Sequence, residues 1–269
     1  MINTIFQTAN YAIEKATQIV MEAYNLPKVT EYKGKTDLVT KTDRQSEEII
    51  INEIQTNFPT HGIIAEESGS TNNESEYQWI IDPLDGTTNF VHSYPSFGIS
   101  IGVMYHNEYI CGIVKEFPAN HTYTAIKGKG AFCDGAQIHV SDVNSLDRSL
   151  LVTGFGYEHG EKWSANMELF KQFTNITQGV RRLGAAAIDL CHVATGKVDG
   201  YWEFDIKPWD TCAGLLIVQE AGGKITKMDG SKYSIHHPQI LATNLNIHSE
   251  MLKVTKPVIE ILKSKNIEL

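Results

Sequence analysis

Apolar residues recur at helical spacing in residues 1–24 and again towards residue 58, which predicts two amphipathic helices. Pro27 ends the first helix, and Thr42 with Gln45 matches a capping box that would begin the second. From residue 97 to 140 the apolar positions mostly alternate, with turn residues between the runs, which predicts successive strands. After residue 149, strand and helix patterns alternate.

The polar segment 141–149 separates these two patterns. We therefore expect an N-terminal α+β subdomain of residues 1–144 and a C-terminal α/β subdomain of residues 145–269. Each apolar helix face and sheet face must be buried against another layer. The pattern as a whole thus predicts a layered α/β or α+β fold, in which the second half stacks on the sheet of the first.

The chain has 269 residues, 42% hydrophobic and 20% charged, enough to bury a large core. Its net charge of −9 argues against binding to nucleic acid or to an anionic membrane. The cysteines are far apart and form no zinc pattern. Glu14 and Lys15 interrupt the first apolar stripe, so it resembles neither a signal peptide nor a membrane span, and we expect a cytoplasmic protein.

The strongest chemical signal lies in residues 79–90. A short apolar, β-branched run is followed by Asp82 and Asp85, with Pro83 fixing the turn between them. Gly86 lets a ligand approach the backbone, and Thr87 or the next threonine is expected to cap a helix whose first N–H groups favour an anion. Carboxylates repel an anion unless cations stand between them, so this pattern indicates divalent metals that hold a phosphate.

Other acids occur at the ends of predicted elements. Glu66 ends a strand that can lie beside residues 79–82, and Asp210 stands at a helix N-terminus after Pro208. Asp43 enters the second helix. Each of these acids could also be an ordinary turn or cap residue, and Lys33 and Lys35 could be solvated loop charges.

The string Asp-Pro-Leu-Asp-Gly-Thr at residues 82–87 resembles the signature of the inositol monophosphatase family, which belongs to the lithium-sensitive, magnesium-dependent sugar phosphatases. The segment around residues 62–68 resembles the family's Gly-x-x-x-Glu-Glu-Ser motif. Residues 209–214 and 220–223 resemble its Trp-Asp-x-x-Ala-Gly and Glu-Ala-Gly-Gly motifs. The resemblance implies an α-β-α-β-α sandwich and a homodimer. It also brings Asp43 and either Lys33 or Lys35 to the active site.

On this basis we expect two or three Mg²⁺ ions, with Mn²⁺ as a substitute, because an oxygen-only cluster suits hard cations. The hypothesis places one ion between Glu66, Asp82 and the carbonyl of Leu84, and another between Asp82, Asp85 and Asp210. Water would be oriented by Thr87, Asp43 and Glu66 for attack on a small phosphate monoester. The N–H groups of Gly86 and Thr87 would hold the phosphate oxygens.

The resemblance also places Ala186 and Glu203 beside the substrate hydroxyls, with Asp85, Asp210 and Lys33 as further substrate contacts. Inositol monophosphate is the expected substrate. The loop at residues 154–157 has aromatic residues where some family members carry a small polar one. This departure leaves open a sugar bisphosphatase, or a phosphatase for nucleotides or NADP, on the same scaffold. A cation-binding interaction module is the alternative that is not an enzyme.

Overall fold

The computed structural model describes residues 1–27, 30–32 and 38–269. Lys33 and Lys35, named above as candidate site residues, lie outside this part of the chain. The two segments predicted as amphipathic helices, residues 1–24 and the segment towards residue 58, are both helical. In the described residues the helices are α1 (Ile2–Tyr24), α2 (Lys41–Asn57), α3 (Thr87–Val91), α4 (Glu161–Ile176), α5 (Ala186–Ala194), α6 (Pro208–Glu220) and α7 (His248–Ser264), with a 3₁₀ turn at Leu146–Arg148.

The larger sheet has eight strands in the order β10-β9-β8-β7-β6-β5-β3-β4. Its strands are β3 (Gly62–Ala65), β4 (Gly69–Thr71), β5 (Tyr77–Asp85), β6 (Phe97–Tyr105), β7 (Glu108–Phe117), β8 (Thr122–Ile126), β9 (Ala131–Cys133) and β10 (Ala136–Ile138). Only the pairing of β3 with β5 is parallel among these described strands. The side-by-side placement expected for these two strands is thus confirmed.

The smaller sheet has five strands in the order β12-β11-β13-β15-β14. They are β11 (Leu150–Thr153), β12 (Gly179–Arg181), β13 (Gly200–Phe204), β14 (Lys224–Thr226) and β15 (Gln239–Thr243). β11 runs parallel to β12 and β13, whereas β15 runs antiparallel to its two neighbours. A separate two-stranded ribbon joins β1 (Thr30–Tyr32) to β2 (Leu38–Thr40).

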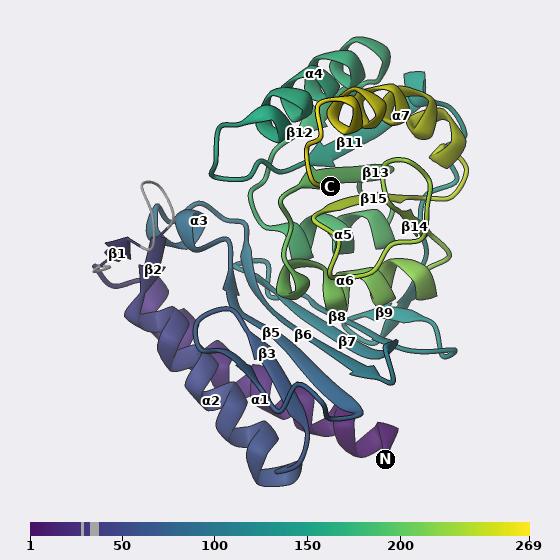
Figure 1. Ribbon diagram of the computed structural model, residues 1–269. Helices are drawn as coiled ribbons and strands as arrows, with labels where there is room; N and C mark the ends of the chain where they lie inside the picture. Colours follow the sequence, from purple (N-terminus) through teal and green to yellow (C-terminus); the bar gives the residue numbers. More distant parts are fainter. Residues whose placement is uncertain (28–29, 33–37) are drawn as a thin grey trace.

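Figure 1 shows five layers, which confirms the predicted sandwich. α1 and α2 cover the outer face of the eight-stranded sheet, α5 and α6 lie between the two sheets, and α4 and α7 cover the outer face of the five-stranded sheet. α1 buries only one stripe, whereas α6 is buried continuously from Thr211 to Val218 because it has a sheet on each side. A middle-layer helix must be apolar on all sides.

Two glycines in the large sheet let α6 pack closely. A Cβ atom at Gly102 would lie 2.4 Å from the Cys212 sulfur, and one at Gly112 would lie 2.7 Å from the Ala213 carbonyl oxygen. Such distances are far below van der Waals contact, so only glycine fits at these positions. The close approach fixes the N-terminal end of α6, which carries Asp210, against β6 and β7.

The predicted start of α2 is wrong by two residues. Thr40, not Thr42, is the N-cap, and its capping-box partner is Asp43 rather than Gln45. The reason is that β2 ends at Thr40 in an extended conformation, which is the backbone geometry that an N-cap needs. The division at residues 144 and 145 stays a prediction, and one apolar cluster contains Ile80 and Val114 together with Leu190 and Leu216. No helix in the described residues is long and apolar enough to span a membrane.

Candidate active site

Strand β5 carries both signature aspartates at its end. It extends through Asp85, further than the sequence predicted, and its pairing with β6 shifts register between Asp82 and Asp85. Pro83 lies in this irregular step, where the missing N–H of proline costs no ladder hydrogen bond. The Leu84 amide donates to Asp82 Oδ1 at 3.0 Å, and the Asp82 side chain is only 2% exposed. The turn thus fixes one buried carboxylate by its own backbone.

Asp85 reaches across to the start of α5. Its two carboxylate oxygens accept hydrogen bonds from the amides of Ala186, at 3.2 Å, and Ala187, at 2.8 Å. The N-cap residue of α5 is Ala185, whose side chain cannot cap a helix, so Asp85 takes that function from the other half of the chain. Sequence reasoning missed this contact, although an uncapped Ala-rich helix start was a signal. Ala186 therefore lies beside Asp85, and its amide is engaged in a hydrogen bond to the Asp85 carboxylate.

Glu66 follows β3, and the parallel register of Ala65 with Ile81 places it next to Asp82. Asp210 is in the first turn of α6, where its carboxylate accepts from the Lys207 amide at 2.7 Å. Burial first, and then the charges of Glu66, Asp85 and Asp210, raise the pKa of Asp82 well above its usual range. The pKa of Asp85 rises to about 7, mainly because of burial. Four carboxylates from three separate elements thus converge on one site.

The chemistry of this cluster fits a hard divalent cation. Its donors are carboxylate oxygens, supplied by Glu66, Asp82, Asp85 and Asp210, and hard cations prefer oxygen ligands. Buried acids that raise one another's pKa repel each other when they are charged, and a bound cation would relieve this repulsion. The donor atoms present therefore fit a hard divalent cation, the class of cofactor that the sequence predicts.

Thr87 does not cap α3 as expected. The N-cap is Gly86, with φ of 82°, and a Cβ there would lie 3.0 Å from the Ser96 carbonyl oxygen. The Thr87 hydroxyl instead lies 2.7 Å from Asp43 Oδ1 and 3.1 Å from the Leu84 carbonyl oxygen. The left-handed turn at Gly86 directs the Thr87 side chain back towards α2, so neither Thr87 nor its neighbour Thr88 makes a cap hydrogen bond.

Asp43 is completely buried in the first turn of α2. Its Oδ2 accepts from the amide of Thr40 at 2.8 Å and from the hydroxyl of Thr40. Burial raises the pKa of Asp43 despite these hydrogen bonds. The structure thus brings Asp43 and Thr87 together, as the resemblance implied.

Two further polar residues on the same face of α2, Ser46 and Glu47, hold the backbone of the candidate site. They were not identified from the sequence. The Ser46 hydroxyl donates to the Pro83 carbonyl oxygen at 2.8 Å. Glu47 accepts the amides of Glu67 and Ser68, both at 2.8 Å, and thereby holds the turn that follows Glu66. The signal was their spacing, since residues 43, 46 and 47 share one helix face with the buried Ile50 and Ile54.

Glu203 lies on β13, close enough to Asp210 for the two carboxylates to interact electrostatically. The Tyr201 hydroxyl donates to Glu203 Oε2 at 2.6 Å, and burial raises the pKa of Glu203 to about 8. A Cβ on Gly154 would lie 2.1 Å from the same Oε2, so glycine is needed there to make room for the carboxylate. The charge of Asp210 also raises this pKa, and that of Arg182 lowers it.

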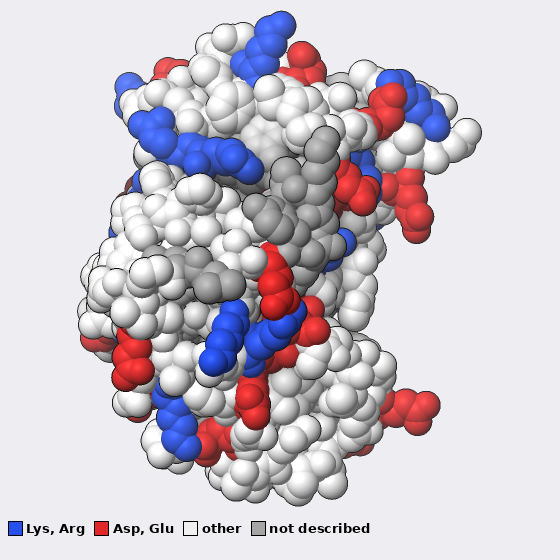
Figure 2. All heavy atoms as spheres, turned by 90° about the vertical axis from the view of Figure 1, so that its left-hand side faces the viewer, with Lys and Arg blue, Asp and Glu red and all other residues white. Residues whose placement is uncertain are grey.

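The face of the molecule that carries β1, β2 and α3 has mixed charge. Figure 2 shows acidic and basic side chains standing beside one another among the residues described there. Arg44 and Glu31, for example, form an exposed ion pair at 2.7 Å on this part of the chain.

Comparisons with known proteins agree on one family. The model of the inositol monophosphatase family matches residues 2–260. The chain is 48% identical to "Phosphatase IMPL1, chloroplastic" of Arabidopsis thaliana, over 98% of this chain and 73% of that protein. It is 41% identical to "Putative Nus factor SuhB" of Neisseria meningitidis, over 94% of this chain and 98% of that protein. The solved inositol monophosphatase of Anabaena superposes with a TM-score of 0.85 at 40% identity, covering 94% of this chain and 95% of that one.

Proposed function

The chain belongs to the inositol monophosphatase family, and we propose that this phosphatase hydrolyses inositol monophosphate to inositol and phosphate with Mg²⁺. The observation that carries the proposal is the convergence of Glu66, Asp82 and Asp85 with Asp210 from the other half of the chain. The name of the similar Anabaena structure supports the choice of substrate.

The proposal places two cations among these acids. One would be held by Glu66, Asp82 and the carbonyl oxygen of Leu84, and the other by Asp82, Asp85 and Asp210. A third ion, or Mn²⁺ in place of Mg²⁺, is compatible with the same oxygen ligands. When bound, the ions supply the positive charge that admits the phosphate, activates water and neutralises the leaving oxygen.

The side chains near Thr87 would position the attacking water. Because the Thr87 hydroxyl can donate its hydrogen to Asp43, its oxygen lone pairs remain available to accept one from water. Glu66, at the end of the neighbouring parallel strand β3, would hold the same water. The amides of Gly86 and Thr87 would bind phosphate oxygens, since positioning and charge stabilisation dominate phosphoryl transfer.

The substrate hydroxyls would lie towards Glu203 and Ala186. Glu203 would accept a hydrogen bond from an inositol hydroxyl, with Asp85 and Asp210 beside it. Ala186 would contribute its methyl group, since its amide donates to Asp85. Lys33, outside the described residues, remains a proposed substrate contact, with Lys35 as the alternative. We also propose a homodimer, in keeping with the family resemblance.

One observation favours a second substrate class, a sugar bisphosphate or a nucleotide such as NADP. The guanidinium of Arg182 lies 5.6 Å from the centre of the Phe155 ring, and its charge lowers the pKa of Glu203. A cation stacked on an aromatic ring beside the hydroxyl side could bind a second phosphate or a base.

The test is phosphate release from inositol 1-phosphate, with Mg²⁺ varied and with EDTA or Li⁺ added. Fructose 1,6-bisphosphate and NADP serve as rival substrates. Asp210→Asn should lower turnover by about 10²-fold or more, because it removes a charged ligand from the cluster. Asp142→Asn changes an exposed aspartate and should have no effect. Near-normal turnover of Asp210→Asn at saturating Mg²⁺ would contradict the assignment. Release that is independent of Mg²⁺ would contradict the metal mechanism, and a faster rival substrate would replace inositol phosphate.

A further inference from the structure

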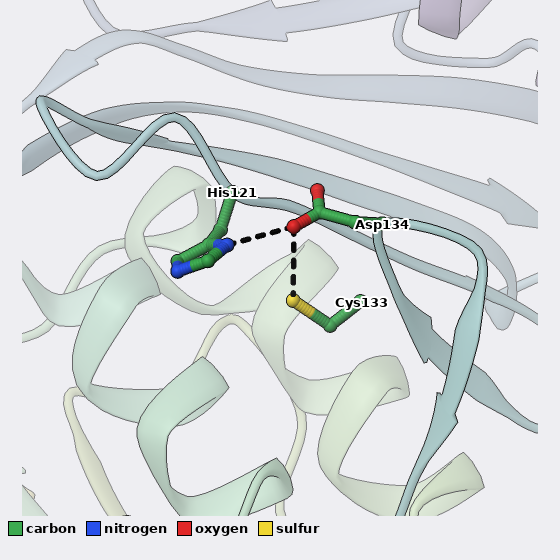
Figure 3. Close-up of side chains that lie close together, drawn as sticks. All are labelled: His121, Cys133 and Asp134. Carbon is green, nitrogen blue, oxygen red and sulfur yellow. Dashed lines mark hydrogen bonds and ion pairs between the residues drawn. The ribbon is translucent and has the colours of Figure 1, made fainter.

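Three side chains gather where strand β8 begins and strand β9 ends, apart from the candidate active site. His121, Cys133 and Asp134 offer one nitrogen, one sulfur and one oxygen atom, and these atoms all lie within 4.8 Å of one another. Figure 3 shows that the three side chains point towards a common centre. His121 Nδ1 lies 2.7 Å from Asp134 Oδ2, and the Cys133 sulfur lies 3.8 Å from the same oxygen.

The backbone makes this arrangement a built feature of the sheet. β8 and β9 pair with Tyr123 opposite Cys133, which brings the residues before β8 and after β9 together. The Asp134 amide donates to the Thr122 carbonyl oxygen at 2.9 Å, and the Thr122 amide donates to Asp134 Oδ1 at 2.8 Å. Asp134 Oδ1 is therefore occupied, and Oδ2 is held towards His121 and Cys133. This is the outer hydrogen bond that orients a ligating carboxylate in metal sites.

The same residues do not form a nucleophilic triad. In a triad the sulfur would face the histidine nitrogen opposite to the one that contacts the carboxylate. Figure 3 shows instead that Nδ1, which bonds Asp134, is the nitrogen on the side of Cys133, while Nε2 points away. Burial also raises the pKa of the Cys133 thiol, so the free thiol is not an activated nucleophile.

We propose that His121, Cys133 and Asp134 bind Zn²⁺ or a similar borderline-soft divalent cation, with water as the fourth ligand. A nitrogen, sulfur and oxygen set suits Zn²⁺ rather than Mg²⁺, in contrast to the oxygen cluster of the active site. Tetrahedral zinc needs ligand atoms roughly 3.3–3.8 Å apart, from its bond lengths of about 2.0–2.3 Å. The sulfur–oxygen pair already has this separation. The distance between His121 Nδ1 and Asp134 Oδ2 is 2.7 Å and must increase slightly when the metal replaces the proton that the two atoms share.

The position is also open enough to admit a cation from solvent. The side chains of His121 and Asp134 are 41% and 49% exposed. Lys115 and Lys197 are the nearby cations: Lys115 donates to Asn120 and Thr122, and Lys197 donates to the Tyr123 hydroxyl.

The experiment is a titration of the whole protein with Co²⁺, used as a spectroscopic substitute for Zn²⁺, in saturating Mg²⁺ and a thiol-free reductant. Cobalt bound to a thiolate gives a charge-transfer band in the near ultraviolet, which oxygen ligands do not produce. We expect this band with one Co²⁺ per chain, and Zn²⁺ should displace it. Phosphatase activity is not part of the readout, so failure of this proposal is distinct from failure of the proposed function.

Variants identify the ligands. Cys133→Ser should abolish the band, and His121→Gln or Asp134→Asn should weaken cobalt binding about tenfold or more. His106→Gln is the matched control, because His106 pairs with Glu76 at 3.4 Å in a similarly exposed position. Circular dichroism would establish that each variant is folded. Absence of the band in the folded parent protein, its survival in Cys133→Ser, or unchanged binding in both other ligand variants would overturn the site.

Discussion

The Thr87 hydroxyl lies 2.7 Å from Asp43 Oδ1, a hydrogen bond that joins the first residue of α3 to the first turn of α2. The two residues belong to different elements, since Thr87 lies in α3 and Asp43 lies in α2. Asp43 also accepts hydrogen bonds from the amide and the hydroxyl of Thr40, and these bonds fix the orientation of its carboxylate. The pair therefore presents a preoriented hydroxyl oxygen at the candidate active site.

Thr87→Val should lower kcat by about 10²-fold, because it removes the hydroxyl that we propose orients water while keeping the side-chain shape. The free energy of unfolding should fall by about 1 kcal/mol from the lost hydrogen bond. Phosphate-release kinetics and urea unfolding measure the two effects. Thr88→Val is the matched control, since the buried Thr88 hydroxyl has no hydrogen-bond partner in the described part of the chain. Equal turnover of the two variants would contradict a role for Thr87.

Glu47→Gln should weaken the response to Mg²⁺ while leaving the chain folded. A carboxamide has one acceptor oxygen, so it cannot receive both amides that Glu47 now holds, and the turn after Glu66 should loosen. The Mg²⁺ concentration for half-maximal activity should rise about tenfold or more, as for other residues that orient metal ligands. Glu48→Gln alters the exposed neighbour on α2 and should leave this concentration unchanged.

Gly154→Ala should displace Glu203, because the new methyl group would lie 2.1 Å from its carboxylate oxygen. If Glu203 binds a substrate hydroxyl, KM should rise about tenfold, which corresponds to about 1.4 kcal/mol, within the range of one lost hydrogen bond. Adding Glu203→Gln to this variant should cause little further change, since both substitutions act on one contact. Gly160→Ala meets open space and serves as control. Full additivity of the two substitutions would show that Gly154 acts in another way.

His248 should make the protein less stable in acid. Its side chain is 2% exposed between Thr226 and Thr243, at 3.0 Å and 2.9 Å. The Thr226 hydroxyl also donates to the Lys227 carbonyl oxygen, so it accepts from the ring, and the other ring nitrogen is left to accept from Thr243. A neutral imidazole satisfies both contacts. Burial, with a smaller contribution from Lys224, accordingly lowers the pKa of His248 from 6.5 to about 4.

Because the folded-state pKa is lowered, the contribution of His248 is fully present above pH 6.5 and is lost as the pH falls towards about 4. The free energy of unfolding, measured by urea with EDTA present, should therefore decline over this range. The decline should be smaller in His248→Gln than in His236→Gln, which changes an exposed histidine. Parallel pH profiles for these two variants would refute the assignment.

Much of the fold could be predicted because each element carries its own local pattern. The apolar stripe of α1 and the placement of Asp210 in the first turn of α6 both agree with the sequence analysis. Local patterns failed at one strand end and at one tertiary contact. Thr42 was assigned the cap that Thr40 makes, and Thr87 was expected to cap α3 but bonds Asp43 instead.

The sequence by itself determined the layered fold class and the set of acids, because helical and strand periodicity and the carboxylate type are properties of short segments. Only the tertiary structure decided how these acids are held. Asp85 caps a helix that starts about a hundred residues later, and Glu47 fixes the turn beside Glu66. It also placed His121 beside Cys133 and Asp134. Such contacts depend on strand register and on helices packed between two sheets, which no segment of the chain encodes alone.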